Sequence, residues 1–279
     1  MTTKKRKPKN VVRRVGIDTG GTFTDFVYEA AGTINVFKVA STPDDPSRAI
    51  AHGLRRIVKE SGTELSEIEI VHGTTVGTNA LLQRRGARVA LVTTAGFEDV
   101  IEIGRQARPE LYNLNAIKPP PVVPTELRFG VAERVACDGE VLESPTSDEL
   151  KRLLEEVQRA QADAVAVCLL FSFVRPEHEQ RIALALEKLQ VPLSVSHQIL
   201  PEYREYERAS TVCVNAYLQP LMGRYLRRFP GYAGLRPAAA RDARAPKLRV
   251  MQSSGGSISA QVAAAEPVRT QSARSSKRS

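Results

Sequence analysis

VRRVGIDTGGTFTDFVYEA, residues 12–30, is the stretch that decides the fold, since it reads as two β-strands joined by a tight turn. Apolar residues dominate both flanks, and the Gly20–Gly21 pair supplies the backbone freedom that a tight turn requires. A third strand is expected at residues 33–40, where apolar and polar side chains alternate. Three strands in close succession predict an antiparallel hairpin with a neighbouring strand.

Helix and strand patterns alternate over the next part of the chain. Asp45 and Pro46 mark a helix start, with an N-cap side chain and a proline at the first helical position, and Gly62 marks its end. Further strands are expected at residues 67–75, 87–94 and 162–173, further helices from Val76, Thr146 and Pro176, and a long helix over residues 205–228 with a bend near Pro220. This alternation predicts an α/β class with a mixed sheet.

One segment, residues 104–130, breaks the pattern. It holds five prolines and no clean period, which is typical of a functional or disordered loop. After it, the sequence ERVACDGEVLES predicts a hairpin that turns at Asp138–Gly139. Thr146 with Glu149 then predicts a capping box at the start of the following helix.

The net charge of +9 is concentrated at the two ends of the chain. Residues 1–14 hold seven Lys/Arg and no acid, and residues 224–279 hold twelve Lys/Arg against two acids, so residues 15–223 carry a net charge of −8. A nucleic-acid-binding protein presents its positive stripe on the folded surface. The sequence therefore favours solvated basic tails and no specific nucleic-acid partner.

Hydropathy and cysteine usage narrow the class of protein further. No run approaches the ~18 apolar residues of a membrane-spanning helix, and the basic start lacks the long apolar stretch of a secretory signal peptide. Cys137, Cys168 and Cys213 are too widely spaced for a metal or redox motif. Both observations indicate a cytoplasmic protein with reduced thiols and no membrane partner.

The strongest chemical pattern is Asp18-Thr-Gly-Gly-Thr-Phe-Thr-Asp25. A Gly20–Gly21 turn brings backbone N–H groups close to an anion, and Thr22 and Thr24 add hydroxyl donors. Asp18, at the end of the first strand, is suited to hold a hydrated Mg²⁺ ion, as metal ligand and catalytic group. The alternative is a plain hairpin turn, but the full string favours a phosphate-binding loop.

A second pattern is His72-Gly-Thr-Thr-Val-Gly-Thr-Asn79, where a strand runs into a helix. The residues with donor groups or exposed backbone suit an anion at a helix N-terminus; they are Gly73, Thr74, Thr75 and Asn79. Ordinary helix capping is the alternative for the threonines. His72 fits either a catalytic acid–base role or a structural role.

Three weaker patterns follow. Arg105 and Arg108 fit a clamp for a substrate carboxylate or phosphate, or two solvated loop charges. Residues 202–208, EYREYER, predict a surface ion-pair ladder, with a domain interface as the alternative. Residues 251–256, MQSSGG, run from a strand into a glycine loop and carry little weight alone.

Together these segments resemble the hydantoinase A/5-oxoprolinase family, which includes acetone-carboxylase-type subunits. The resembling strings are VGIDTGGTFTDFV, VHGTTVGTNALLQRRGARVALVTTAGFEDVIEIGRQARPELYNL, ILPEYREYERASTVCVNAYLQPLMGRYL and VMQSSGG. The resemblance runs from about Arg14 to Arg228 and resumes over residues 248–268. So many strings in the same order make it specific.

The resemblance implies an α/β fold of the actin-like/hexokinase-like (ribonuclease-H-like) ATPase type. Family members use ATP with Mg²⁺ or another divalent cation to phosphorylate an unreactive amide or carbonyl oxygen. The substrate is then hydrolysed, or carboxylated in some relatives, with a hydantoinase B-type subunit or fused domain as partner. The resemblance assigns the first phosphate loop to Asp18, Gly20, Gly21, Thr22 and Thr24, and active-site lining to the stretch 72–79 and the Arg105 region.

The expected domains are a basic tail (1–13), a hydantoinase/oxoprolinase N-terminal domain (14–200), the start of a truncated hydantoinase A second domain (201–265) and a disordered basic tail (266–279). After PVRT, residues 267–270, the sequence departs from the family pattern, which continues into a second lobe with a second phosphate loop and the adenosine pocket. The first lobe is therefore expected to be followed by an incomplete second lobe.

Two classes of function remain open from the sequence. The first is a subunit or fragment of an ATP-dependent cyclic-amide hydrolase, whose substrate is a hydantoin, 5-oxoproline or a related carbonyl compound. The second is a non-catalytic truncated remnant, or a binding or assembly module without a complete nucleotide site.

Overall fold

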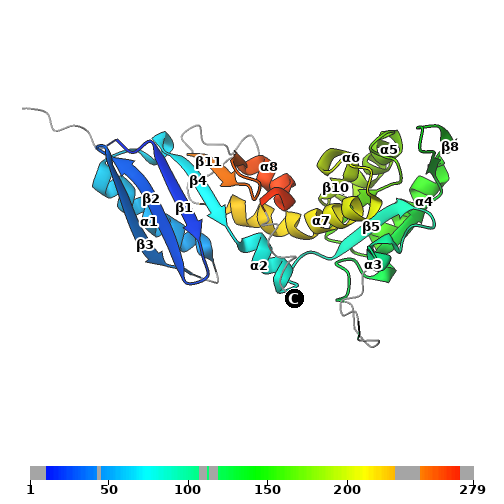
Figure 1. Cartoon of the computed structure of the whole chain (residues 1–279), viewed down its shortest axis with the longest axis horizontal. Coiled ribbons are helices and arrows are strands. Elements are labelled where there is room, and N and C mark those ends of the chain that lie inside the picture. The colour runs from blue at the N-terminus through cyan, green and yellow to red at the C-terminus, as the bar shows by residue number, and fades with distance from the viewer. Residues whose placement is uncertain (1–10, 43–44, 107–111, 113–118, 230–245, 271–279) are drawn as a thin grey trace, which may run out of the picture. The chain divides into compact units, whose positions relative to one another are not determined.

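The computed structural model describes residues 11–42, 45–106, 112, 119–229 and 246–270. The chain folds as two compact units, each described here by itself (Figure 1). Unit 1 comprises the residues up to Gln83 together with those from Leu221 onward, and unit 2 comprises Arg84–Pro220. The units differ from the expected domain boundaries because the last segment of the chain returns to the first sheet.

Unit 1 is built on a six-stranded mixed sheet in the order β12-β11-β4-β1-β2-β3. Its strands are β1 (Arg14–Thr19), β2 (Phe23–Ala30), β3 (Thr33–Ala40), β4 (Glu69–Thr74), β11 (Lys247–Met251) and β12 (Ser257–Ser259). The antiparallel β1–β2–β3 arrangement confirms the prediction from the opening stretch. The central strands β1, β4 and β11 run parallel to one another, so their carboxyl ends lie at one edge of the sheet.

Helix α1 (Pro46–Ser61) covers one face of this sheet, as its sequence signals predict. Asp45 caps its first turn, and Gly62 ends it in a left-handed conformation with φ of 71°. A side chain at Gly53 would lie 2.1 Å from the Phe26 ring, so glycine is required for the helix to approach the sheet. Phe26 in turn stacks on Phe37 at 4.8 Å between ring centroids.

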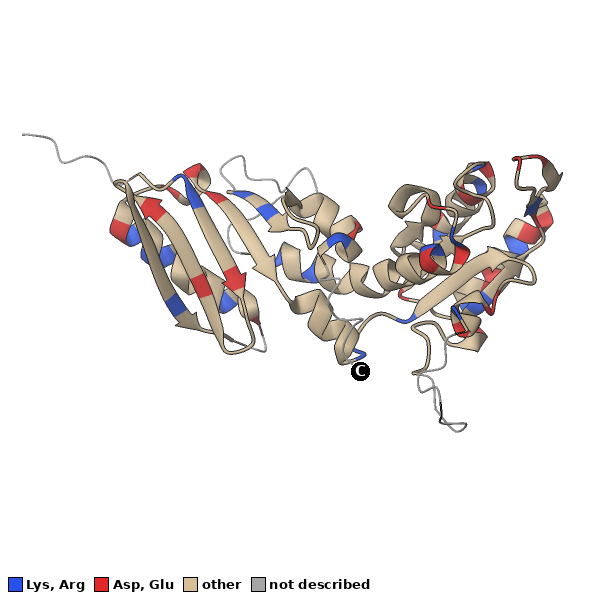
Figure 2. Ribbon diagram, viewed as in Figure 1, with Lys and Arg blue, Asp and Glu red and all other residues tan. Residues whose placement is uncertain are grey.

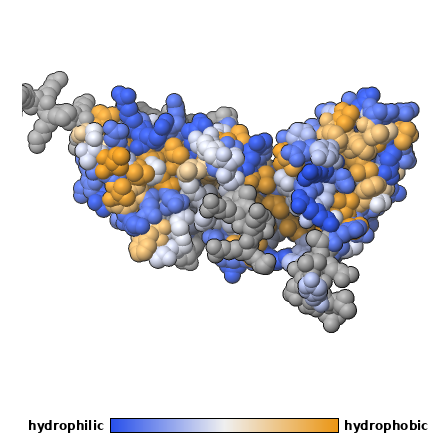
Figure 3. Space-filling model, in the orientation of Figure 1, coloured by the Kyte–Doolittle hydropathy of each residue, from blue (hydrophilic) through white to orange (hydrophobic). Residues whose placement is uncertain are grey.

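The remaining elements of unit 1 are short. They are η1 (Leu65–Glu67), α2 (Val76–Leu82), the end of α7 (Glu205–Arg227), α8 (Ala260–Ala265) and η5 (Pro267–Thr270). The predicted tail does not hold for residues 267–270, because Pro267 and Thr270 are buried in η5. On the face of the sheet away from α1, apolar side chains stay exposed on β2 and β3; they are Val27, Ile34 and Val36. Figure 3 shows orange, hydrophobic surface over the part of unit 1 where these strands lie.

Unit 2 is built on a four-stranded parallel sheet in the order β10-β9-β5-β6. Its strands are β5 (Val89–Thr94), β6 (Arg128–Val131), β9 (Ala164–Cys168) and β10 (Leu193–Val195), with a separate hairpin of β7 (Arg134–Val135) and β8 (Val141–Glu143). Its helices are α3 (Val100–Ile103), η2 (Thr125–Leu127), α4 (Ser147–Arg159), α5 (Glu177–Leu186), η3 (Glu187–Leu189), α6 (Ser196–Ile199) and the first part of α7. Every residue of β5 and β9 is buried, as their apolar runs predict.

Several local predictions are confirmed in unit 2, and two are wrong. The Thr146–Glu149 capping box is present, and the hairpin turns at Asp138–Gly139. The strand expected over residues 162–173 ends at Cys168, because the following residues turn away through Phe171, whose φ is 50°. The irregular segment 104–130 ends earlier than predicted, because residues 128–130 belong to β6, which pairs with β5; residues 107–111 and 113–118 lie outside the described residues.

Candidate functional site

Three parallel strands of unit 1 each end in a turn rich in glycine, serine and threonine. Strand β1 leads into residues 19–22, β4 into residues 73–79 and β11 into residues 251–256. Because β4 pairs with both β1 and β11 in parallel, the three turns emerge at the same sheet edge. The carboxyl edge of parallel strands is where α/β folds bind their ligands.

The first turn is braced from behind and open in front. The Gly20 N–H donates to the Phe23 carbonyl at 3.0 Å, which closes the turn. Ser41 donates its N–H to the Thr22 carbonyl and its hydroxyl to the Gly20 carbonyl, both at 2.9 Å. A methyl group placed at the exposed Gly21 would meet nothing within 4 Å. The tip of the turn thus leaves room for a ligand to approach the backbone.

Asp18 lies at the exposed end of β1, beside the second turn. It pairs in register with Gly73 of β4. A side chain at Gly73 would have its Cβ only 3.1 Å from Asp18 Oδ1. Glycine at this position therefore makes the space that the Asp18 carboxylate occupies.

The second turn contacts the first directly. The Thr75 hydroxyl donates to the Thr19 carbonyl at 3.4 Å, and Asn79 Nδ2 donates to the Thr75 hydroxyl at 3.4 Å. The Val76 N–H donates to the Thr74 hydroxyl at 3.2 Å, which starts helix α2. Thr75 and Asn79 are exposed, so the structure brings these predicted residues to the same edge as Asp18, Gly20, Gly21 and Thr22.

The sequence of the third turn was weak evidence for a site on its own. The register of β11 against β4 shows that this turn lies beside the second one. Val250 pairs with His72, so Met251 and the residues after it continue beside Gly73. The Gln252 N–H donates to the Gly256 carbonyl at 3.1 Å, and Gly256 has a φ of 78°. The signal that the sequence offered was a strand followed by SSGG, the same kind of pattern as the first turn.

His72 lies inside unit 1 and has no solvent exposure. Its Nε2 shares a hydrogen bond of 2.6 Å with the Tyr225 hydroxyl, and its ring lies 5.2 Å from the ring of Phe229. Burial lowers the pKa of His72 to about 4, because the imidazolium form loses its hydration. Burial also raises the pKa of Tyr225 to about 12. This environment keeps the imidazole neutral and suits a residue that positions the turns from behind.

Three other predicted site residues lie elsewhere. Thr24 is buried, and its hydroxyl is bonded to the Ser41 hydroxyl at 3.1 Å, so it braces the turn. Arg105 belongs to unit 2 and forms an ion pair of 2.5 Å with Glu207. Arg108 lies outside the described residues.

The residues present fit a hydrated divalent cation held together with a phosphate. Within the described ranges, no three His, Cys, Asp or Glu side chains gather as a metal cage. Mg²⁺ in nucleotide sites is bound by one or two carboxylates, water and the phosphates themselves. Asp18, exposed beside a turn that can take the phosphates, is the carboxylate that such an ion requires.

Unit 2 contains buried polar groups whose contacts the sequence did not predict. Arg208 is buried and donates to the Leu169 and Glu202 carbonyls, both at 2.6 Å, so the prediction of a surface ion-pair ladder is wrong for this residue. Two buried carboxylates, Glu133 and Glu179, each bind a histidine, at 2.8 Å and 2.7 Å. The hydrogen-bond partners of the two carboxylates come from four segments of the chain, around residues 94, 169, 178 and 196–197, so the spacing of the sequence gave no sign of these contacts.

The cysteines are unpaired, in agreement with the sequence. Cys168 and Cys213 are buried, and burial raises the pKa of Cys168 to about 11 and that of Cys213 further. Cys137 is exposed. Across the described segments, no helix has the length and apolarity needed to cross a bilayer.

Comparison with known proteins matches most of the chain to one family. The model of the hydantoinase/oxoprolinase N-terminal region matches residues 14–190, and the hydantoinase/oxoprolinase model matches residues 208–273. Caprolactamase subunit alpha of Pseudomonas jessenii is 37% identical over 226 residues, which cover 77% of this chain and 32% of that protein.

Two solved structures share the fold. The nucleotide-free structure of acetone carboxylase, from work on ATP-dependent acetone carboxylation, superposes with a TM-score of 0.78 at 26% identity, over 93% of this chain and 38% of that one. The ATP-dependent caprolactamase from Pseudomonas jessenii gives a TM-score of 0.76 at 33% identity, over 92% and 38%. The predicted mixed α/β fold of the actin-like ATPase type is confirmed. The chain spans 32% to 38% of the length of these three relatives.

Proposed function

Because the chain belongs to the hydantoinase/oxoprolinase family, we propose that it carries part of the nucleotide site of an ATP-dependent enzyme that opens a cyclic amide. The observation that carries the proposal is the meeting of three donor-rich turns at one sheet edge, with the Asp18 carboxylate between two of them. This arrangement offers backbone N–H groups, hydroxyls and one carboxylate to a Mg²⁺-bound phosphate chain.

Each residue of the edge has a distinct task in this proposal. Gly21 and Thr22 present the open tip of the first turn to phosphate oxygens, and Ser41 holds that tip rigid from behind. Asp18 holds a hydrated Mg²⁺, and Thr75 with Asn79 supplies further polar contacts from the second turn. Phosphoryl transfer depends almost wholly on such positioning and on charge stabilisation, so a rigid cradle is what the chemistry needs.

The chemistry that bound ATP supplies is a phosphoryl group for an amide or carbonyl oxygen. Phosphorylation would make the carbonyl carbon more electrophilic, so that one water could add to it as the ring C–N bond breaks. A second water would then release the phosphate from the ring-opened product. We propose Arg105 and Arg108 as contacts for the substrate and a hydantoinase B-type subunit as partner, in line with the naming of caprolactamase by its subunits. Carboxylation of a ketone is the variant suggested by the likeness to acetone carboxylase.

A second candidate is a binding or assembly module without turnover of its own. Binding of Mg²⁺·ATP distinguishes the two candidates, because a binding or assembly module needs no nucleotide.

The test is calorimetric titration of Mg²⁺·ATP into the chain and three variants. Gly21→Ala places a methyl group where the ligand approaches, in space that is empty within 4 Å, so the fold should tolerate it. Asp18→Asn removes the charge that holds the cation. Both are expected to weaken binding at least about tenfold, the range of a lost charge-assisted contact.

The control is Glu29→Gln, which removes an equal charge from an exposed position near the end of strand β2, away from the turns. It should bind as the parent does. Unchanged affinity in both Gly21→Ala and Asp18→Asn would contradict the assignment. A folded parent chain that binds no Mg²⁺·ATP would favour the assembly module.

A further inference from the structure

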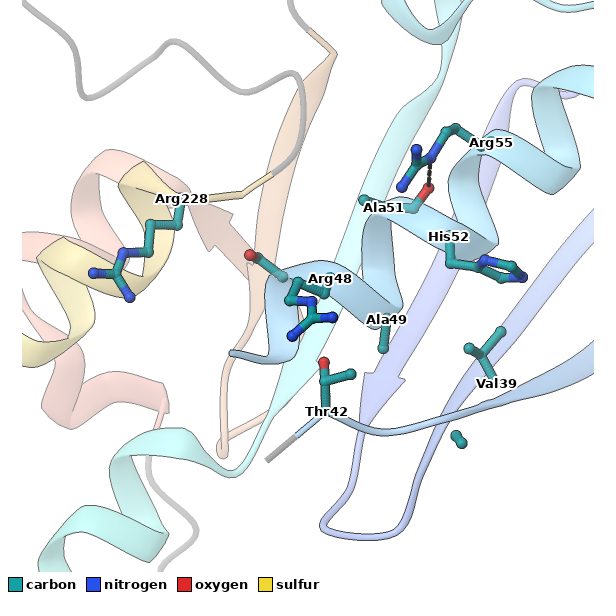
Figure 4. A pocket seen from close by; sticks show the side chains of 10 residues that line it. Val39, Thr42, Arg48, Ala49, Ala51, His52, Arg55 and Arg228 are labelled. Carbon is teal, nitrogen blue, oxygen red and sulfur yellow. Dashed lines mark hydrogen bonds between the residues drawn. The ribbon is translucent and has the colours of Figure 1, made fainter. Parts of the chain in front are cut away.

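Unit 1 contains a cavity that the three turns do not use. It has a volume of about 630 Å³ and lies between the end of β3, the first half of α1 and the residue that follows α7 (Figure 4). Figure 4 shows Arg48 and Arg55 extending from one side of α1 and His52 extending toward Val39. Its lining is Val39, Ala40, Thr42, Ser47, Arg48, Ala49, Ala51, His52, Arg55 and Arg228.

The cavity is strongly positive. Three arginines and one histidine are among its described lining residues, and none of those described residues is acidic; the Asp45 carboxylate lies next to it, bonded to Ser47. Lys and Arg positions recur along α1, as Figure 2 shows in blue. Figure 4 shows the Arg48 and Arg55 side chains extending from α1, whereas the Arg228 guanidinium points away from this helix. Two guanidinium groups beside one hollow raise the local concentration of anions beyond what a single surface arginine does.

The cavity arginines also lack the ion pairs that their neighbours have. Arg56, one residue from the lining, pairs with Glu60 at 2.9 Å and lies over the Phe37 ring at 4.4 Å. Among the described residues, no carboxylate comes within ion-pair distance of Arg48, Arg55 or Arg228. Arg55 donates one hydrogen bond, from Nε to the Ala51 carbonyl at 3.1 Å. Within the described part of the chain, Arg56 on this helix therefore has a carboxylate partner, whereas Arg48 and Arg55 have none.

The helix terminus does not account for the site. The N-terminal N–H of Ser47 already donates to the Asp45 carboxylate at 3.1 Å, and the Ser47 hydroxyl does so at 2.6 Å. The arginines therefore carry the attraction. Their guanidinium forks match the paired oxygens of phosphate and carboxylate groups, which they bind through two parallel hydrogen bonds.

We propose that this cavity binds a small polyanion through phosphate or carboxylate oxygens, with Arg48 and Arg55 as its principal contacts. Arg48 and Arg55 lie about two helical turns apart on α1, so a ligand that contacts both has at least two anionic groups. The site is independent of the nucleotide edge and carries no step of the proposed reaction. It adjoins the brace of the first turn through the chain, because Thr42 follows Ser41 directly.

The experiment titrates inorganic pyrophosphate and, separately, citrate into the whole chain without Mg²⁺, at about 0.15 M salt, where weak surface attraction is screened. Arg48→Ala and Arg55→Ala are each expected to weaken binding at least about fivefold, and the double variant to abolish it. Tighter binding of pyrophosphate assigns a phosphate ligand, and tighter binding of citrate a carboxylate ligand.

Two controls make the test specific. Lys59→Ala removes one exposed positive charge from the same helix outside the cavity and should change affinity less than about twofold. Gly21→Ala alters the first turn and should leave pyrophosphate binding unchanged. Equal weakening by Lys59→Ala, loss of binding in Gly21→Ala, or no binding of either anion by the folded parent chain would each overturn the proposal. All exchanged residues except Gly21 are exposed side chains, so thermal midpoints should stay within a few degrees.

Discussion

The two units end their parallel strands in opposite ways. In unit 1, β1, β4 and β11 run out into turns that contain exposed residues, among them Gly21, Thr22 and Thr75. In unit 2, the carboxyl ends of β5 and β9 are closed by the buried carboxylates Glu133 and Glu179. The comparison teaches that the carboxyl edge of a parallel sheet stays open to a ligand only where buried side chains do not bond its strand ends.

Glu179 shows how completely unit 2 uses its donors. Its Oε1 accepts from the Leu169 N–H at 2.9 Å and the Ser196 hydroxyl at 2.6 Å. Its Oε2 accepts from the His197 N–H at 3.0 Å and from Nδ1 of His197 at 2.7 Å. One side chain thereby joins the end of β9 to α5 and α6.

The second closure is made by Glu133. It accepts from the Thr94 hydroxyl at the end of β5 and binds His178 Nδ1 at 2.8 Å. The same Thr94 hydroxyl accepts from the Leu170 N–H at 3.0 Å, beyond the end of β9. In unit 2, the polar groups at these strand ends are hydrogen-bonded to the protein's own side chains.

The largest expected effect comes from opening the closed edge. Glu179→Ala leaves two backbone N–H groups and two side chains without their acceptor inside the protein. We expect the free energy of unfolding to fall by about 3–5 kcal/mol, the usual cost of removing one partner from a buried charged network. Urea denaturation followed by circular dichroism measures it.

The matched control is Glu177→Ala, an exposed carboxylate two residues earlier on the same helix. It should change the free energy of unfolding by less than about 0.5 kcal/mol. A loss below about 1 kcal/mol in Glu179→Ala would show that the network does not hold the closed edge, and the contrast between the units would fail.

The next effect concerns the buried support of the open edge. The pKa of His72 is lowered to about 4 in the folded chain, whereas an unfolded histidine titrates near 6.5. Between these values the unfolded state binds more protons, so the free energy of unfolding falls as the pH drops through this window. We expect a loss of up to about 3 kcal/mol between pH 7 and pH 4 from this residue.

Denaturation curves of the parent chain and His72→Gln across that range measure the loss. The variant keeps a polar side chain within reach of Tyr225 but removes the titrating group, so its stability should vary less with pH. His52→Gln removes an exposed imidazole on α1 and serves as control. If parent and His72→Gln lose stability in parallel, the burial of His72 does not determine the acid response.

The open edge was largely predictable from the sequence because its signals are local. The Asp18–Gly20–Gly21–Thr22 string lies within one turn, and the Gly73–Asn79 string lies within the next. Parallel pairing of β1 with β4 then brings the two strings together. What the sequence did not reveal is the position of the third turn beside the second, since β11 lies far along the chain and joins β4 only in the folded sheet.

The closed edge was not predictable, for the corresponding reason. Glu133 and His178 are 45 residues apart, and neither has a neighbour in sequence that suggests the pair. Arg208 carries the same lesson, because its spacing from Glu202 and Glu205 indicated a surface ladder, while tertiary packing buries it against the Leu169 carbonyl. Thr24 was predicted to contact the phosphate, and His72 to be a catalytic or a structural residue; both side chains are buried, which fits a supporting role behind the turns.

The smallest expected effect tests whether the open edge is as finely fitted as its geometry suggests. Gly73→Ala puts a Cβ at 3.1 Å from Asp18 Oδ1 and 3.5 Å from Met251 Sδ, so the carboxylate must shift by a few tenths of an ångström while the strand pairing is kept. We expect the affinity for Mg²⁺·ATP to fall about three- to tenfold, up to about 1.4 kcal/mol, with stability reduced by less than about 1 kcal/mol. Calorimetric titration beside urea denaturation separates the two effects.

The same exchange made in the Asp18→Asn variant should cost little further affinity, because the carboxylate that the methyl group displaces is already gone. Additive losses in the double variant would mean that Gly73 acts on the ligand through the turn backbone and that Asp18 needs no space made for it.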